Sequence, residues 1–259
     1  MRRSILAVTL LAGTTFGTAA GAETVAALVG DATLAHVDTA TKAVVKTVTI
    51  SGPGGRVLGI DVRPADGLLY AVMADGTVAT IDPATGTATA KSKLDTVLAA
   101  GVAATVDFNP VADRLRIIGT DGTNLRANVD DGKVTKDGSL KFAEADSQKG
   151  KTPRVVAGAY TNSFKGAKET VLFDIDASGA LLRQAPPNDG VLNTIGALGM
   201  SAEAVSFDIL SDGQGGNQGW AMAGDTLYRL DLATGKGETV AKIAGLTGPV
   251  RDIAILPAR

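Results

Sequence analysis

The chain has 259 residues, a net charge of −2, 45% hydrophobic residues and no cysteine. The lack of cysteine excludes disulfides and thiolate metal sites, and the near-neutral charge gives no electrostatic basis for binding nucleic acid. The length fits one domain of a repeat type, or at most two ordinary domains, and the hydrophobic content is ample for a core.

Residues 1–22 have the pattern of a secretory signal peptide. Arg2 and Arg3 provide a basic start, an apolar stretch runs from Ile5 to Gly17, and Ala20-Gly21-Ala22 is a small-residue cleavage site. Glycine and threonine interrupt this stretch, whereas a transmembrane helix needs about 20 apolar residues. We therefore predict an exported protein, periplasmic or extracellular, without a membrane anchor after cleavage; Sec and twin-arginine export both stay open.

A short phrase recurs along the rest of the chain: an aliphatic residue, an aspartate, and a turn that ends in Thr-Gly or a close variant. It occurs at Val37–Lys42, Ile81–Gly86, Val129–Gly132 and Leu230–Gly235. A repeat period of roughly 40–50 residues is typical of propellers and other repeat folds. Between these phrases apolar and polar residues alternate with period two, as in strands, and Asp-Gly pairs indicate tight hairpins.

Four short strands followed by a longer connection make one blade. Complete blades are expected at residues 57–91, 104–135 and 204–243, and a less regular one from Arg154 onward, in which Pro186–Gly190 replaces the repeated phrase. Between Asp95 and Gly101 the pattern allows a short turn of helix.

The remaining strands lie at the two ends of the chain. Thr24–Val29, Thr33–Val37 and Val44–Ile50 precede the first complete blade, and Val250–Leu256 follows the last. Together they make a fifth blade, which closes the ring and removes exposed edges. We predict an all-β, five-bladed propeller over residues 23–259, with four antiparallel strands per blade.

Specific motifs lie mainly in the middle of the chain. They include Asp107–Pro110, Asn124–Asn128, Ala159–Asn162, Pro186–Asn188 and Leu192–Gly196. In these motifs the chain resembles a bacterial family known as domain of unknown function 4394, over most of residues 56–252. The resemblance implies a secreted or periplasmic β-propeller-like domain. It implies no reaction and therefore brings no catalytic residue.

Acidic residues on the first strands of the blades are the candidates for catalysis. Asp61 and Asp107 are aligned on strands that would line a central channel, and Glu203 precedes another such strand. Paired carboxylates about 5–9 Å apart are what a glycoside hydrolase needs. The alternative is that Asp61 and Asp107 bind the backbone of neighbouring blades and hold the ring together. Aromatic residues, the usual platforms for sugars, make up only 4% of the chain, which disfavours a glycosidase.

The densest polar cluster lies on adjacent strands of the second complete blade and is the predicted ligand-binding site. It contains Arg114, Arg116, Asn124, Arg126 and Asn128. Arginine side chains bind carboxylates and phosphates with two hydrogen bonds at once. The alternative is that these arginines pair with nearby acids, such as Asp107, Asp113 and Asp130.

Two patterns raise the question of a metal site, although we predict none. Asp174, Asp176 and Ser178 match the first half of a calcium loop, but a hairpin would have the same letters and the twelfth position is Ala185 rather than glutamate. Turns after the second strands carry aspartates that either form a rim for a cation or cap their own turns: Asp31, Asp75, Asp121 and Asp225. The single histidine, His36, excludes a multi-histidine zinc site and has the sequence context of a packing or surface residue.

The sequence therefore favours a non-catalytic, monomeric module without a cofactor, which binds a small ligand or an extracytoplasmic protein. A carboxylate-dependent hydrolase and a scaffold stabilised by a divalent cation are the alternatives.

Overall fold

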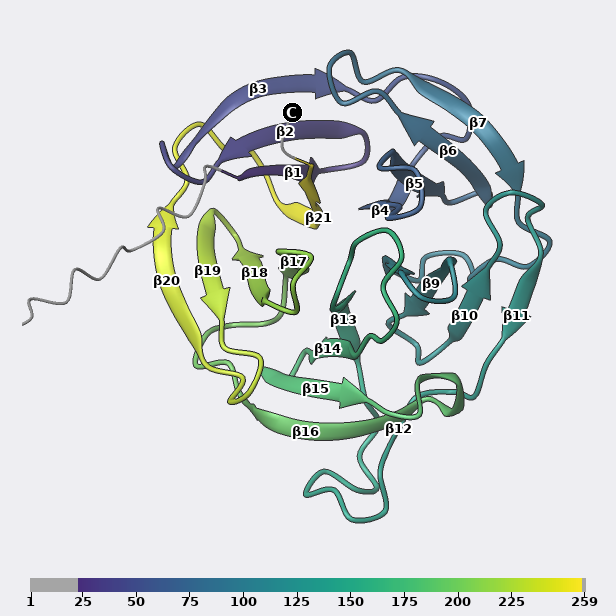
Figure 1. The fold of residues 1–259 in the computed structure, drawn as a ribbon, viewed down its shortest axis with the longest axis vertical. Helices are drawn as coiled ribbons and strands as arrows, with labels where there is room; N and C mark the ends of the chain where they lie inside the picture. Colours follow the sequence, from purple (N-terminus) through teal and green to yellow (C-terminus); the bar gives the residue numbers. More distant parts are fainter. Residues whose placement is uncertain (1–22, 258–259) are drawn as a thin grey trace, which may run out of the picture.

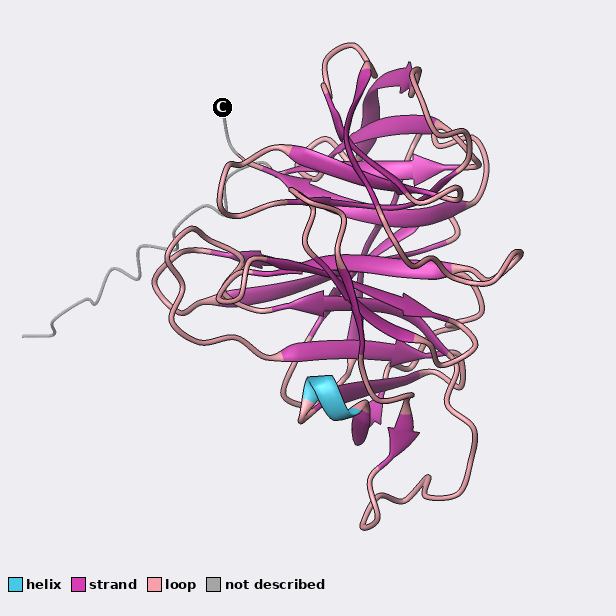
Figure 2. Ribbon diagram, turned by 90° about the vertical axis from the view of Figure 1, so that its right-hand side faces the viewer, coloured by secondary structure: helices cyan, strands magenta, loops and turns pink. Residues whose placement is uncertain are grey.

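The computed structural model describes residues 23–257, in which 21 strands form five sheets around a central axis (Figure 1). The predicted signal peptide, residues 1–22, lies outside the described residues. The five-bladed propeller predicted from the sequence is confirmed. In the side view the strands of successive blades fill the molecule, and one short helix is drawn (Figure 2).

Each complete blade runs from an inner strand to an outer strand, in chain order. The first contains β4 (Val57–Val62), β5 (Leu69–Met73), β6 (Thr77–Ile81) and β7 (Ala88–Lys93). The second contains β8 (Ala104–Asn109), β9 (Arg114–Gly119), β10 (Asn124–Ala127) and β11 (Val134–Lys136). The third contains β13 (Val155–Tyr160), β14 (Leu172–Asp176), β15 (Ala180–Gln184) and β16 (Val191–Ala197). The fourth contains β17 (Val205–Ser211), β18 (Asn217–Ala223), β19 (Thr226–Leu230) and β20 (Gly237–Lys242).

The closing blade joins the two ends of the chain, as predicted. Its order is β21-β1-β2-β3, with β21 (Val250–Leu256) innermost, followed by β1 (Thr24–Val29), β2 (Thr33–Asp38) and β3 (Ala43–Thr49). β21 pairs antiparallel with β1, and Ala27 lies opposite Ile253. This pairing gives β1, an otherwise free edge, a partner from the far end of the chain.

The third blade differs from the prediction by one strand. Its last hairpin is the predicted Pro186–Gly190 turn, which contains the 3₁₀ helix η1 (Pro187–Asp189). The unpredicted strand is β12 (Lys141–Phe142), which pairs parallel with the outer strand β16. β12 belongs to the long connection from the second blade, and its two residues are too few to show a period-two pattern in the sequence.

The repeated phrase is a capped hairpin turn. In the first complete blade, the Asp82 carboxylate accepts hydrogen bonds from Ala84 N and Thr85 Oγ1, and Gly86 takes a φ of 76°. In the second blade the same position belongs to Asn128, whose carbonyl accepts a hydrogen bond from Gly132 N, four residues later. Asn128 therefore takes the place of the aspartate in this copy of the phrase, and the assignment of Asp130 to that place was wrong.

The helical turn expected after Asp95 is wrong as well. Residues 94–101 form an irregular connection, in which Asp95 Oδ1 accepts a hydrogen bond from Val134 N of the next blade. Within residues 23–257, no helix has the length and apolar character needed to cross a membrane.

The core consists of the interfaces between adjacent blades. Tyr70 and Phe108, from the first and second blades, are at most 1% exposed and pack edge to face with ring centroids 5.3 Å apart. The inner strands are buried on both faces, so they read as nearly continuous apolar runs. An aspartate on such a strand is therefore costly unless its carboxyl group has partners.

Candidate functional site

Four buried aspartates on inner strands hold neighbouring blades together. Asp61, Asp107, Asp208 and Asp252 lie on β4, β8, β17 and β21 and are at most 6% exposed. Each accepts a hydrogen bond from a backbone N–H of the next inner strand; the donors are Phe108 at 2.7 Å, Tyr160 at 3.0 Å, Ile255 at 2.7 Å and Ile60 at 2.9 Å, respectively. This is the ring-holding role that the sequence raised for Asp61 and Asp107. No such bond leaves the third blade, because β13 carries no acidic residue.

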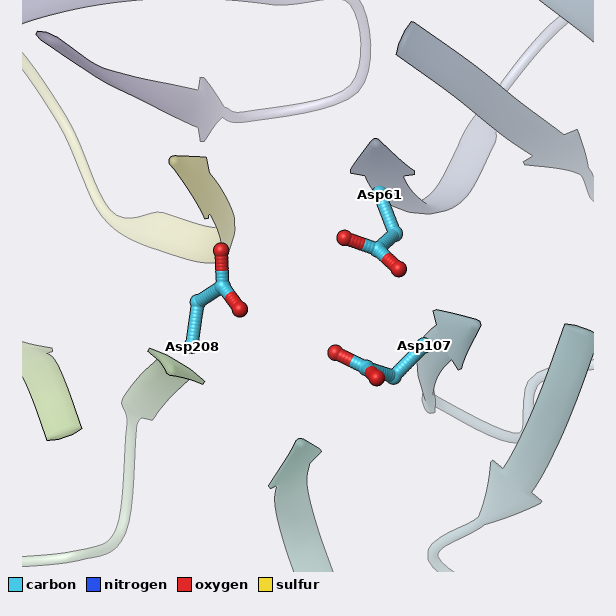
Figure 3. A group of neighbouring side chains, drawn as sticks. All are labelled: Asp61, Asp107 and Asp208. Carbon is cyan, nitrogen blue, oxygen red and sulfur yellow. The ribbon is translucent and has the colours of Figure 1, made fainter. Parts of the chain in front are cut away.

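Three of these carboxyl groups meet near the axis of the ring. One oxygen from each of Asp61, Asp107 and Asp208 lies within 4.8 Å of the others. All three side chains extend into the central space from three different blades (Figure 3). We call this set the channel triad. Asp252, which forms the same kind of backbone bond, is not part of it.

The triad brings three acidic groups together without a basic partner. Burial, reinforced by repulsion from the other buried aspartates, raises the pKa of Asp61 and of Asp107 well above the usual range. Burial likewise raises the pKa of Asp208, to about 6. Backbone N–H groups oppose these shifts, and no Lys or Arg of residues 23–257 is among the groups that do so. A bound cation would supply the missing positive charge.

A cavity of about 340 Å³ opens two members of the triad to the outside. It is lined by Asp61 and Asp208, and by other oxygen-bearing side chains from Glu23, Ser163 and Ser211. This size falls within the range of small-ligand sites. The opening lies at the end of the channel where β4 and β21 finish, and we call it the channel mouth.

A larger cavity, of about 740 Å³, lies beside the channel mouth and shares Leu256 and Pro257 with it. Its polar lining consists of threonines and Asp82, whose carboxylate caps its own hairpin. Because it brings no charged groups together, the smaller cavity is the better candidate site.

Glu203, the third acid proposed for a hydrolase, is exposed in the loop before β17 and does not join the channel triad. The structure thus brings Asp61 and Asp107 together with Asp208 instead. Asp208 was not among the acids predicted from the sequence, although it is the fourth residue of β17, as Asp107 is of β8.

The predicted arginine site is centred on a buried structural residue. Arg116 is 2% exposed and donates hydrogen bonds to Tyr160 Oη, Asn124 Oδ1 and Asn188 Oδ1, and it also forms an ion pair with Asp137. Asn124 is 1% exposed and donates to the carbonyls of Gly138 and Pro187. These contacts connect the second blade with the third and with the crossover between them.

The other members of the predicted site lie nearer the surface. Arg126 binds Asp137 with two hydrogen bonds, and Arg114 donates to the carbonyls of Ala112 and Asp113. Asn128 caps the hairpin described above. Ligand binding by this group stays a prediction, although few of the donors of Arg116 are left for a ligand.

Two of the three acids expected to pair with these arginines bind Arg63 of the first blade instead. Asp113 and Asp130 each lie within 2.8 Å of the Arg63 guanidinium, and Asp66 and Tyr70 complete its surroundings. These carboxylates raise the pKa of Arg63. Arg63 was not among the site residues predicted from the sequence, although it directly follows the inner strand β4.

The structure separates the residues of the suggested calcium loop. Asp176 uses both carboxylate oxygens to accept backbone hydrogen bonds, from Arg154 and Ser178, in the hairpin after β14. Asp174 is fully buried, and neither of its oxygens has a hydrogen-bond partner among the described residues. Burial raises the pKa of Asp174 to about 8, against the opposing effect of Arg116.

The lone histidine and the turn aspartates have structural contacts. His36 is 8% exposed, and its Nε2 lies 2.8 Å from the Pro83 carbonyl oxygen. Asp75 and Asp121 cap their own turns, by accepting hydrogen bonds from the backbone N–H groups of Thr77 and Thr123.

Comparison with known proteins agrees with the fold. Residues 33–254 match the family model described as a domain of unknown function, DUF4394. A solved protein of unknown function from Bacteroides thetaiotaomicron has a TM-score of 0.52 and 17% identity, with 92% of this chain and 67% of that chain covered. Another, from Bacteroides caccae, has a TM-score of 0.44 and 14% identity, with 86% and 73% covered. No curated protein matches the chain.

Proposed function

Because the chain belongs to the DUF4394 family, whose description assigns no function, we propose a function from its own geometry: a non-catalytic binding module that takes a cationic ligand at the channel mouth. The observation that carries this proposal is the open cavity lined by Asp61 and Asp208, with Asp107 beside them and no basic group among the described residues that offsets them. A cation that enters this partly desolvated site favours the ionised form of the carboxyl groups and binds in place of their protons.

The contacts of the triad favour binding over hydrolysis. Asp61 and Asp107 already accept backbone hydrogen bonds from the inner strand of the next blade, a contact that we call a blade joint. A carboxylate acting as nucleophile or base would give up these contacts during the reaction, whereas a bound cation shares the carboxylate with them.

Calorimetric titration of the purified protein with calcium chloride, magnesium chloride and spermidine tests the proposal. At least one of these cations binds, and Asp61→Asn and Asp208→Asn weaken the binding, whereas Arg126→Ala, in the second blade, leaves it unchanged. Binding of none of the three cations contradicts the proposal. If Arg126→Ala alone weakens binding, the site lies on the second blade instead.

We also propose that the protein is exported, on the basis of its N-terminal pattern. The protein recovered from the periplasm or the medium then begins at Glu23. An intact N-terminus on cytoplasmic protein would contradict export.

A further inference from the structure

We propose that the cationic ligand is a divalent ion of calcium size, bound by one carboxylate oxygen each from Asp61, Asp107 and Asp208. This inference rests on the proposed function, and it adds the identity of the cation and of the residues that coordinate it.

The arrangement of the triad favours calcium over magnesium. One oxygen of each aspartate lies within 4.8 Å of the others, so a single ion between them can contact all three. Calcium binds oxygen at about 2.3–2.6 Å in flexible geometry, whereas magnesium requires about 2.0–2.1 Å and near-ideal octahedral geometry. The three side chains are held on inner strands of three different blades, and calcium adapts to such preset positions more readily than magnesium does.

A second observation concerns the free oxygen of Asp107. Asp107 is 5% exposed, and its Oδ1 accepts the hydrogen bond from Tyr160 N. Its Oδ2 accepts no hydrogen bond from any residue of the described chain. The Asp107 side chain extends toward Asp61 and Asp208 in the central space (Figure 3). Because this oxygen has no donor within the described chain, it is the atom that the nearly buried Asp107 side chain offers to an ion in the central space.

The donor set is that of a hard cation. The triad offers only carboxylate oxygens, which suit calcium and magnesium rather than zinc or copper. Calcium takes six to eight oxygen ligands, so three carboxylates leave positions open toward the cavity lined by Glu23, Ser163 and Ser211. Water or the hydroxyl groups of a further ligand would complete the shell there.

The ion would also act as a clamp on the ring. Its three ligands come from the first, second and fourth complete blades. Binding to the folded state alone stabilises the protein by an amount that grows with the ratio of ion concentration to Kd.

The test compares two aspartate-to-asparagine variants in chelator-treated protein. Asp107→Asn keeps the Oδ1 acceptor for Tyr160 N but replaces the free oxygen with an amide nitrogen, so it removes a calcium ligand and spares the blade joint. Asp252→Asn is the matched control, because Asp252 is equally buried and forms the same kind of joint outside the triad.

Calorimetry and thermal melting are measured with calcium, magnesium and spermidine. Calcium is expected to bind more tightly than magnesium and to raise the Tm of the unaltered protein and of Asp252→Asn. Asp107→Asn is expected to weaken calcium binding by at least about tenfold, as the loss of even an indirect metal contact does.

Equal calcium affinity in both variants overturns the inference, as does magnesium binding as tight as that of calcium. Binding of spermidine without any binding of calcium overturns it as well but leaves the proposed function standing, and binding of no cation removes both.

Discussion

Asp174 gives a test of how the fold tolerates a buried carboxyl group. It is fully buried on β14, has no hydrogen-bond partner among the described residues, and occupies space left by Gly158, where a Cβ atom would lie 2.5 Å from Asp174 Oδ1. Its pKa is raised from 3.8 to about 8, because burial disfavours the charged form. Asp174→Asn keeps the shape of the side chain and removes its ionisation.

The sign of the effect follows from linkage between protons and folding. The folded state holds the Asp174 proton more tightly than the unfolded state, so the contribution of this group to stability is largest below pH 3.8 and is lost as the pH rises to about 8. The whole loss is roughly 6 kcal/mol at 1.36 kcal/mol per pKa unit. Between pH 5 and 8, the free energy of unfolding of Asp174→Asn should therefore rise relative to that of the unaltered protein by roughly 1.4 kcal/mol per pH unit and then level off.

Urea unfolding of both proteins at five pH values from 5 to 9 measures this difference. Other titrating groups are common to the two proteins and cancel in the comparison. The control is Asp75→Asn, because the pKa of Asp75 is lowered to about 2, chiefly by Lys93, so that the group stays ionised in both states throughout this range. A difference for Asp174→Asn that does not change with pH, as expected for Asp75→Asn, would refute the account of Asp174.

The remaining predictions concern packing around the second and third blades. Arg116→Ala should lower the free energy of unfolding by about 3 kcal/mol or more, because it removes a buried partner of Asp137 and leaves several acceptors unsatisfied. Arg126→Ala should lower it by less, because Arg126 is partly exposed. A larger loss for Arg126→Ala than for Arg116→Ala in urea unfolding would contradict this order. Gly158→Ala should destabilise the protein by about 1–3 kcal/mol, because the new Cβ meets the Asp174 carboxylate. Combining it with Asp174→Ala should restore part of that loss, and strictly additive effects would show that the two residues do not interact.

The architecture was accessible from the sequence because each blade repeats local signals. The number of blades follows from the repetition of hairpin turns such as Asp82–Gly86 and of strands with period-two alternation. The unmatched strands at the two ends of the chain then predict that they pair and close the ring. The short strand β12 escaped this reasoning, since its pairing with β16 depends on a long crossover rather than on a local pattern.

The candidate site was only partly accessible. The alignment of Asp61 with Asp107 identified two members of the channel triad, but the third, Asp208, was not predicted, although it is the fourth residue of its strand, as Asp107 is. Which side chains reach the axis depends on the three-dimensional course of each strand, which a linear alignment does not contain. Arg116 was predicted to bind a ligand, but the structure shows it bound to other residues of the chain. Its partners Asp137 and Asn188 come from connections whose path the sequence does not reveal.

A crystal structure of the protein grown with calcium tests the central claim most directly. The account predicts an electron-density peak between Asp61, Asp107 and Asp208, with one oxygen of each at about 2.3–2.6 Å. A triad without such a peak at millimolar calcium, or a calcium ion bound elsewhere while the three carboxyl groups contact only one another, would contradict it.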